Sequence, residues 1–204
     1  MRSILTIILL FSLTSVQAQN SEQKRILFFG DSITAGLGVD KSQAFPALIQ
    51  QKVDSAGLNY EVINGGLSGE TSAGGLRRID WVLQRKIDVF ILELGGNDGL
   101  RGIELSSTKN NLQKIIEKVQ QKYPDVKIIL AGMQVPPNLG QEYTSEFENM
   151  YPELSDENDL PLIPMILDKI GGNENLMQGD GIHPTPEGHQ VIAENVWDKL
   201  EPRL

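Results

Sequence analysis

Cysteine is absent from the 204-residue sequence, and this absence removes several kinds of chemistry at once. A thiol nucleophile, a disulfide framework and any metal site ligated by cysteine are excluded. Histidine is scarce as well, with two residues in the whole chain, so few imidazole groups are available as a base. The lack of cysteine leaves the compartment undecided, because exported proteins also occur without it.

Basic residues are in the minority, since 18 Lys and Arg stand against 27 Asp and Glu and give a formal net charge of −9. A chain of this charge repels a phosphate backbone, so nucleic acid is not an expected partner. With 40% hydrophobic residues over 204 positions, the composition predicts one compact domain with a sizeable core.

Long apolar runs are also lacking, apart from one near the N-terminus. Arg2 is followed by an apolar run at residues 4–16, which leads to the small residue Ala18. This order is typical of a secretory signal, and the run is shorter than the ~20 residues that a spanning helix needs. We therefore expect residues 1–18 to be a signal cleaved after Ala18, and residues 19–204 to be a single periplasmic or secreted domain without a membrane span. A retained membrane anchor or a buried first strand is the alternative.

The rest of the chain alternates between short apolar runs and helical spacings. Runs that predict strands lie at residues 26–29, 60–63, 88–94, 126–130 and 160–163. Apolar residues at helical spacing occur at 44–53, 76–83 and 112–119, and a terminal helix is expected after Pro186. Strands that are apolar on both faces and separated by helices indicate an α/β fold of three layers, α/β/α, with a parallel, flavodoxin-like five-stranded sheet. Residues 139–157 have the least regular pattern and predict a loop with a short helix.

Three loops each follow a predicted strand, at residues 30–32, 65–71 and 95–98. Because parallel strands end at one edge of a sheet, we expect these loops to meet there. Ser32 opens a helical turn in the first loop, near backbone N–H groups that can stabilise an oxyanion. A serine hydroxyl becomes a good nucleophile only when a base removes its proton. A helix-capping serine is the alternative interpretation of this position.

His183 is the candidate base of the two histidines. It follows Asp180 by three positions, close enough for the carboxylate to hydrogen-bond one ring nitrogen and fix the tautomer. His189 falls within the predicted terminal helix, where a solvated or core-edge position is expected. Without a serine partner, His183 would be an ordinary histidine in a structural turn.

Donors for a developing negative charge are found in the other two loops. Gly69 can present a bare backbone N–H group, and Asn97 can add a side-chain amide. An amide aimed at an oxyanion is worth about 3 to 4 kcal/mol in other hydrolases. Glycine and asparagine also favour ordinary strand-to-helix turns, so each loop taken alone has a structural explanation.

The joint occurrence of these segments resembles a known family. The segments that resemble the four conserved blocks of the SGNH (GDSL-type) hydrolases are Gly30-Asp31-Ser32-Ile33-Thr34, Gly69, Gly95-Gly96-Asn97-Asp98 and Asp180-Gly181-Ile182-His183-Pro184. The resemblance runs from Arg25 to Leu200 and is strongest to the bacterial thioesterase, lysophospholipase and arylesterase group. Ile33 stands where the family nickname has leucine, and isoleucine is a common variant there.

The resemblance implies the SGNH hydrolase fold, with Ser32 as nucleophile, His183 as base and Asp180 as its orienting acid. It implies an oxyanion hole made by the backbone N–H groups of Ser32 and Gly69 and by the Asn97 side chain, with no metal and no cofactor. The implied substrates are small acyl esters or thioesters, lysophospholipids among them, and a monomer is expected. An apolar groove for the acyl chain is predicted from loop residues beside the site, namely Leu100, Ile103, Leu105, Val135, Pro136 and Leu139.

Three other functions fit parts of the pattern. A metal-dependent phosphoesterase would use Asp31, Asp98, Asp180 and His183 as hard ligands, although two-metal hydrolases usually gather more histidines. A flavodoxin-like binding module would share the fold and leave these side chains without a role. A carbohydrate acetylesterase of the same family would use exposed aromatic residues, whereas Trp81 and Trp197 are both expected to pack in the core.

Overall fold

The computed structural model describes residues 22–135 and 137–204 of the chain. The predicted signal, with its cleavage point after Ala18, lies outside the described residues, and so does Pro136. Among the described helices, none is long and apolar enough to cross a membrane.

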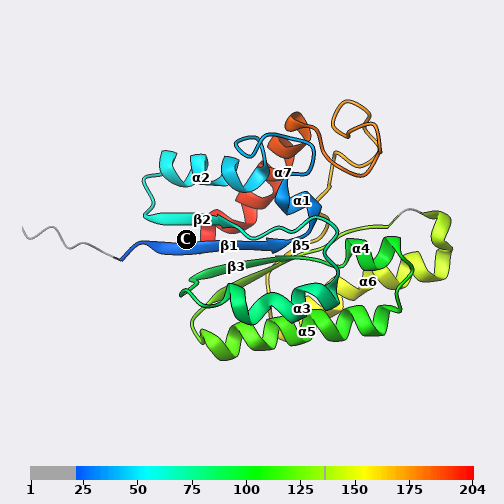
Figure 1. Cartoon of the computed structure of the whole chain (residues 1–204), viewed down its shortest axis with the longest axis horizontal. Helices are drawn as coiled ribbons and strands as arrows, with labels where there is room; N and C mark the ends of the chain where they lie inside the picture. Colours follow the sequence, from blue (N-terminus) through cyan, green and yellow to red (C-terminus); the bar gives the residue numbers. More distant parts are fainter. Residues whose placement is uncertain (1–21, 136) are drawn as a thin grey trace, which may run out of the picture.

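Five parallel strands form one sheet in the order β2-β1-β3-β4-β5 (Figure 1). The strands are β1 (Lys24–Gly30), β2 (Tyr60–Asn64), β3 (Val89–Glu93), β4 (Lys127–Ala131) and β5 (Leu162–Ile163). The chain runs from β1 outward to β2 and then crosses back to β3 on the other side of β1. Folds of this kind bind ligands beyond the carboxyl ends of the strands where the order reverses, which here is the edge after β1 and β3.

Helices cover both faces of the sheet, so the predicted three-layer fold is confirmed (Figure 1). The helices α1, α2 and α7 lie on one face, and α3, α4, α5 and α6 lie on the other. Their bounds are α1 (Ser32–Ala35), α2 (Phe45–Ser55), α3 (Ser72–Val82), α4 (Gly96–Leu100), α5 (Leu105–Lys122), α6 (Gln141–Asn158) and α7 (Pro186–Leu200). Short 3₁₀ turns occupy Pro137–Leu139 and Glu201–Arg203.

The central strands are buried on both faces. All five residues of β3 are buried, which explains why its sequence is a continuous apolar run rather than an alternating one. On β1, Phe28 meets Phe45 of α2 edge-on at 5.2 Å between ring centroids, whereas Phe29 lies 5.6 Å from Phe90. Successive side chains of β1 therefore pack on opposite faces of the sheet, as the pleat of a strand requires.

The prediction of a loop with a short helix at residues 139–157 is wrong, because α6 is a continuous helix of 18 residues. The buried side chains of α6 recur at helical spacing, and they are Phe147, Met150, Tyr151, Leu154 and Ser155. Pro152 interrupts this pattern in the sequence and is exposed in the structure. Burying large apolar side chains yields about 1.5 to 3 kcal/mol each, which together exceeds the ~3 kcal/mol cost of one helical proline.

Trp81 is not in the core, contrary to the prediction, because 72% of the residue is exposed on α3. Ile79 of the same helix is fully buried, and a residue two positions along a helix points about 200° away from it. Trp81 therefore lies on the solvent side of α3. Trp197 is partly buried and packs against the core, as expected.

Candidate active site

The turn after β1 holds Ser32 at the carboxyl edge of the sheet. Asp31 caps α1, and its Oδ1 accepts a hydrogen bond from the Ile33 N–H at 3.0 Å. Ser32 is the first residue of α1 and is 8% exposed. Its hydroxyl thus lies at a helix N-terminus, where backbone N–H groups lack partners within the helix.

Gly30 is required by a close approach of two side chains. A Cβ atom at this position would overlap the Thr34 hydroxyl and the Glu93 carboxyl. The Gly30 carbonyl accepts a hydrogen bond from the Leu67 N–H at 3.0 Å, which draws the loop after β2 against the turn after β1. Two of the three predicted loops therefore meet at one edge.

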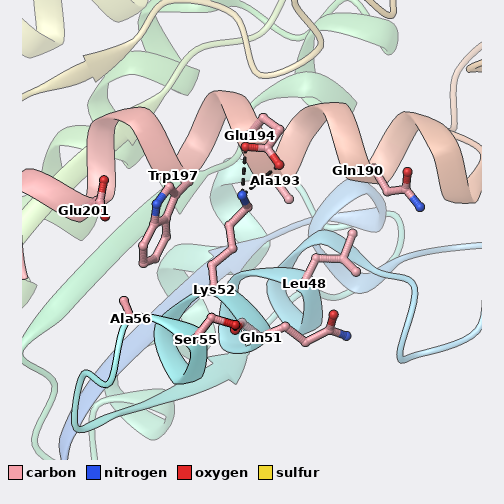
Figure 2. Close-up of a pocket in the computed structure, with 10 residues that line it drawn as sticks. All are labelled: Leu48, Gln51, Lys52, Ser55, Ala56, Gln190, Ala193, Glu194, Trp197 and Glu201. Atoms are coloured by element: carbon pink, nitrogen blue, oxygen red, sulfur yellow. Dashed lines mark hydrogen bonds and ion pairs between the residues drawn. The ribbon is translucent and has the colours of Figure 1, made fainter.

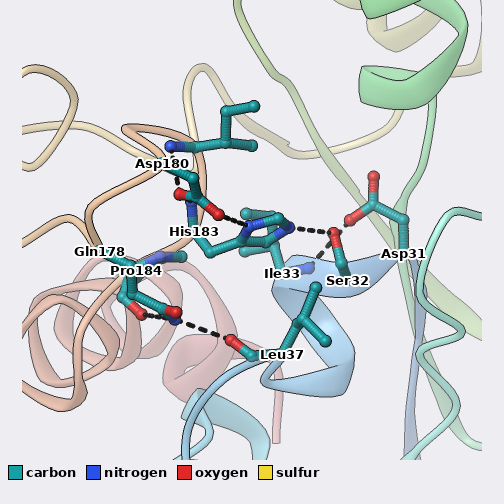
Figure 3. Close-up of polar contacts among 9 residues, drawn as sticks. Asp31, Ser32, Ile33, Leu37, Gln178, Asp180, His183 and Pro184 are labelled. Carbon is teal, nitrogen blue, oxygen red and sulfur yellow. Dashed lines mark hydrogen bonds and ion pairs between the residues drawn. The ribbon is translucent and has the colours of Figure 1, made fainter.

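Ser32, His183 and Asp180 form a continuous chain of hydrogen bonds (Figure 3). His183 Nε2 lies 3.0 Å from Ser32 Oγ, and His183 Nδ1 lies 2.6 Å from Asp180 Oδ2. Because the carboxylate faces Nδ1, the ring proton belongs on that nitrogen and Nε2 is left to accept the proton of the serine hydroxyl. This arrangement can activate a serine as a nucleophile.

Asp180 stays ionised beside the imidazole. The hydrogen bond with the His183 side chain, followed by bonds from the backbone N–H groups of His183 and Ile182, holds the pKa of the Asp180 carboxyl well below its ordinary value. Those N–H groups donate to Asp180 Oδ1 at 3.0 and 2.9 Å. One oxygen thus shapes the turn while the other orients the ring. The carboxylate is ready to stabilise an imidazolium at any pH at which the imidazole can charge.

Gln178 ties the histidine turn to the serine turn (Figure 3). Its side-chain amide donates to the Leu37 carbonyl at 2.7 Å and to the Pro184 carbonyl at 2.8 Å. Leu37 in turn donates its N–H to the Ser32 carbonyl at 3.1 Å. Gln178 therefore fixes the position of the His183 turn relative to the Ser32 turn, although the two are far apart in the sequence. No pattern in the sequence indicated this role for Gln178.

Asn97 lies at the start of α4, beside the serine turn. Its Nδ2 donates to Asp31 Oδ2 at 3.0 Å, so that Asp31 orients the side chain. Asn97 is half-buried and shares one hollow with Ser32 and His183. An amide held in this way has a second N–H bond available for an oxyanion.

Gly69 lies in the loop before α3 with a positive φ of 77°, a backbone conformation that favours glycine. Its carbonyl accepts a hydrogen bond from the Arg101 guanidinium at 3.2 Å. The end of the loop is anchored by Asp98, which accepts from the Ser72 N–H at 2.8 Å and from the Ser72 hydroxyl at 2.5 Å. Gly69 is exposed and its N–H has no hydrogen bond recorded in the described part of the chain.

Asp98, which the phosphoesterase alternative would use as a metal ligand, is 1% exposed and already engaged on both oxygens. A third bond reaches its Oδ1 from the Thr108 hydroxyl at 3.3 Å. Within residues 22–135 and 137–204, no three His, Asp or Glu side chains are gathered so that they could hold a metal ion.

A hollow of about 250 Å³ opens beside Ser32 and His183. The apolar side chains that line it are Ile33, Leu100, Met133, Leu167, Met177 and Ile182. Leu100 and Ile182 are each 41% exposed, so the apolar lining continues to the surface at the mouth. The hollow can receive an apolar group next to the serine hydroxyl.

Of the predicted acyl-groove residues that the structure describes, only Leu100 lines this hollow. Val135 is buried against Gly99, the Ile103 carbonyl accepts from the Tyr143 hydroxyl, and Leu105 and Leu139 pack against the core. Met133 and Leu167 were missed by sequence reasoning. The rule that loops after strands meet at one edge points to Met133, which follows β4, whereas Leu167 has no comparable signal.

A larger surface hollow lies elsewhere, between α2 and α7 (Figure 2). It measures about 660 Å³ and is spanned by the ion pair of Lys52 and Glu194 at 2.7 Å. Lys52 also lies over the Trp197 ring, 6.0 Å from its centroid. This hollow contains no pair of a nucleophile and a base, so size alone does not identify the reactive site.

His189 is fully buried in α7, which corrects the prediction of a solvated or core-edge position. Its Nδ1 accepts a hydrogen bond from the Phe45 N–H at 3.3 Å, and its ring stacks on the Phe45 ring. The imidazole therefore links α7 to the start of α2 and takes no part in the hollow beside Ser32.

The comparisons with known proteins identify the family of the chain. Residues 28–191 match the model of the GDSL-like Lipase/Acylhydrolase family. The chain belongs to this family. Esterase TesA of Pseudomonas aeruginosa is 39% identical over 187 residues, which cover 91% of this chain and 92% of that protein. Thioesterase 1/protease 1/lysophospholipase L1 of Escherichia coli is 36% identical over 178 residues, covering 87% and 83%.

A crystal structure named TesA superposes on this GDSL-family chain with a TM-score of 0.85 and 40% identity, covering 89% of this chain and all of that one. The three-layer fold is therefore the SGNH hydrolase fold. With these relatives, the protein is a carboxylic ester hydrolase that acts on small acyl substrates.

Proposed function

We propose that this GDSL-family hydrolase is an exported serine esterase that uses Ser32 as nucleophile, His183 as base and Asp180 as orienting acid. The observation that carries the proposal is the unbroken chain from Ser32 Oγ to His183 Nε2 at 3.0 Å and from His183 Nδ1 to Asp180 at 2.6 Å. A nucleophile, its base and the acid that orients the base are the three parts that acyl transfer needs.

The reaction runs in two halves. His183 takes the Ser32 proton as the serine oxygen attacks the substrate carbonyl, and the oxyanion is held by the N–H groups of Ser32 and Gly69 and by Asn97. His183 then gives the proton to the leaving alcohol or thiol, which departs and leaves the acyl group on Ser32. Water repeats the sequence with His183 as base and releases the acid. Each step uses only side chains and backbone N–H groups of this chain, with water as the second reactant, so no metal or cofactor is required.

The hollow beside Ser32 is proposed to hold the acyl group. Its volume of about 250 Å³ is below the ~300 to 1,000 Å³ of pockets for drug-sized ligands. Short and intermediate acyl chains fit inside, and a longer chain extends over Leu100 and Ile182 at the mouth. Aryl esters, acyl-CoA thioesters and lysophospholipids all contain such an acyl group. The hollow is therefore expected to select the length of the acyl chain more strongly than the alcohol or thiol that leaves.

Export is proposed from the signal-like residues 1–18, and the mature domain from residue 19 is proposed to act as a monomer in the periplasm or outside the cell. The carbohydrate acetylesterase is the second candidate within the family. Trp81 is exposed, as a sugar-stacking residue would be, but it does not line the hollow beside Ser32. Esters with acyl chains longer than acetate are therefore the better test substrates.

The decisive experiment is hydrolysis of p-nitrophenyl esters from acetate to palmitate by protein lacking residues 1–18. We expect Ser32→Ala to lose about 10⁵-fold or more in kcat, by analogy with other serine hydrolases. Ser55→Ala, an exposed serine on α2, is the matched control and should retain full activity. A fluorophosphonate should label wild-type protein and Ser55→Ala, but not Ser32→Ala.

Several results would reject the proposal. Activity that survives Ser32→Ala, or that EDTA abolishes, would favour a metal-dependent mechanism. Hydrolysis of acetate alone, with no activity from butyrate upward, would favour the acetylesterase. If the wild-type protein neither hydrolysed any ester nor reacted with the fluorophosphonate, the flavodoxin-like binding module would be the remaining interpretation.

A further inference from the structure

Glu93 is a carboxyl group buried directly beneath the serine turn. It is the last residue of β3 and is 0% exposed. Its Oε2 accepts hydrogen bonds from the Thr34 hydroxyl at 2.6 Å and from the Asp31 N–H at 3.2 Å. Its Oε1 has no hydrogen-bond partner among the described residues. The absence of a side chain at Gly30 makes the space that this carboxyl occupies.

The surroundings of Glu93 are unsuited to a negative charge. Both donors to its Oε2 are uncharged, and a buried carboxylate with an unpartnered oxygen is costly. Arg78 of α3 is engaged elsewhere, with Glu70 and with the carbonyls of Gly30 and Gly65. The other titratable groups around the turn are Asp31, Asp98, Tyr151 and His183. Burial, reinforced by the charge of Asp31, raises the pKa of the Glu93 carboxyl well above its ordinary value.

Asp31 is better suited to carry the charge. Each of its oxygens accepts one N–H bond, from Ile33 at 3.0 Å and from Asn97 at 3.0 Å. Burial raises the pKa of Asp31 to about 6, and the hydrogen bonds from the Ile33 N–H and the Asn97 amide, followed by the charge of His183, oppose that rise. At neutral pH Asp31 is therefore ionised. Two buried carboxyls in one site do not both ionise, so the proton remains on Glu93.

We propose that Glu93 is a positioning residue, held as an uncharged acid under the serine turn, which keeps Asp31 ionised so that Asp31 can orient the Asn97 amide beside Ser32. This inference rests on the proposed serine mechanism, because it assigns Glu93 an effect on the oxyanion donor. Glu93 touches no reacting atom and acts through Asp31 and Thr34.

The role predicts how different replacements of Glu93 rank. Glutamine is uncharged and can accept the two bonds made to Oε2, so Glu93→Gln should keep kcat within about threefold of wild type. Glu93→Leu removes the acceptor of the Asp31 N–H and Thr34 hydroxyl bonds, releases Asp31 and Asn97, and should lower kcat about 100-fold with little change in KM. Asp31→Asn places an amide against the Asn97 amide and should cost a similar factor in kcat.

The experiment compares wild type, Glu93→Gln, Glu93→Leu and Asp31→Asn in kcat, KM and the acidic limb of the pH profile, with Glu148→Gln on α6 as the exposed control. Melting temperatures establish which variants fold. If Glu93→Leu does not fold, the kcat of Asp31→Asn is compared with that of wild type instead. The acidic limb of Glu93→Gln should match that of wild type, because an uncharged group is exchanged for another. The infrared difference spectrum of wild type against Glu93→Gln at pH 8 should show the carbonyl band of a protonated carboxyl.

Three results would overturn the inference. The first is a kcat of Glu93→Gln as low as that of Glu93→Leu. The second is a shift of about one pH unit in the acidic limb of Glu93→Gln, which the loss of a neighbouring charge would cause. The third is the absence of the infrared band of a protonated carboxyl in the wild-type protein. The infrared measurement does not need activity, so it judges the protonation of Glu93 even if Ser32 proves not to be the nucleophile. Failure of the serine mechanism itself would appear as wild-type protein that neither hydrolyses esters nor reacts with fluorophosphonate.

Discussion

His189 shows how burial of a single side chain makes stability depend on pH. Its Nδ1 accepts from Phe45, so the ring proton belongs on Nε2, which has no hydrogen-bond partner in the part of the chain described. Burial, with a smaller contribution from the charge of His183, lowers the pKa of His189 from 6.5 to about 4. The folded protein thus keeps this imidazole uncharged under conditions in which the unfolded chain protonates it.

We predict that His189→Gln flattens the pH dependence of stability between pH 6.5 and 4. A group whose pKa is lower in the folded state contributes fully above its unfolded value, and that contribution is lost as pH falls through the folded value. A difference of this size corresponds to a loss of about 3 kcal/mol in wild type by pH 4. Urea unfolding at several pH values measures the slope.

Glutamine is a suitable replacement at position 189, because its carbonyl can accept from Phe45 and it does not titrate. Wild type and His189→Gln should therefore differ least above pH 7 and most near pH 4. Equal slopes for the two proteins would show that the imidazole is already protonated in the folded state, or that other groups dominate.

Individual residues of the site differed in how visible they were in the sequence. Ser32, Asp180 and His183 could be selected because each lies in a distinctive segment and the chain has only two histidines, and the structure brings the three together. Glu93 could not be selected, because a carboxyl at the end of an apolar strand suggests a solvated end. Its burial follows from the packing of Thr34 and the turn at Gly30, which no local pattern reveals.

The helix α6 contributes buried side chains to the core and contains an internal proline, which weakens it. Pro152 lacks the N–H group that would donate to the carbonyl of Glu148, and it is exposed, so nothing in the core depends on its ring. Pro152→Ala should raise the free energy of unfolding by about 1 to 3 kcal/mol. Chemical denaturation measures the change.

Glu148→Ala, also exposed on α6, is the control for that substitution and should change stability by less than about 0.5 kcal/mol. Activity should be retained in both variants, because neither residue faces the hollow beside Ser32. A Pro152→Ala protein no more stable than wild type would mean that the rigidity of proline in the unfolded chain compensates for the missing hydrogen bond.

At the level of elements, the sheet was easier to predict than the helices. Buried parallel strands are marked by continuous apolar runs, and all five were located, although β5 is reduced to the two residues that pair with Leu130 and Ala131. The helix α6 was missed because Pro152 obscured its spacing. Trp81 was misplaced because it follows Ile79 in a helical pattern, yet two positions along α3 turn its side chain to the opposite side of the helix.

At the scale of the whole molecule, export is the prediction that the fold does not address. When the protein is expressed with residues 1–18 in a Gram-negative host, it should appear in the periplasmic fraction. Its mass should be that of the cleaved chain, which begins at Gln19. Ala18→Phe should block cleavage, since the site requires a small residue, and should yield the full-length mass. Mass spectrometry of fractionated cells makes the comparison.

Asn20→Gln, a conservative change beyond the cleavage point, serves as the control and should be processed like wild type. Full-length protein in the cytoplasmic fraction of the wild-type culture would contradict the proposal. Processing at another position would correct its boundary and leave export intact.

The hydrogen bond between Ser32 and His183 joins residues that are 151 positions apart. A ribosome has therefore made nearly nine-tenths of the chain before the second partner exists. For an enzyme that cleaves acyl esters, this separation is a form of latency. Until residue 183 has been added and the sheet has formed, no base lies beside Ser32 to activate its hydroxyl.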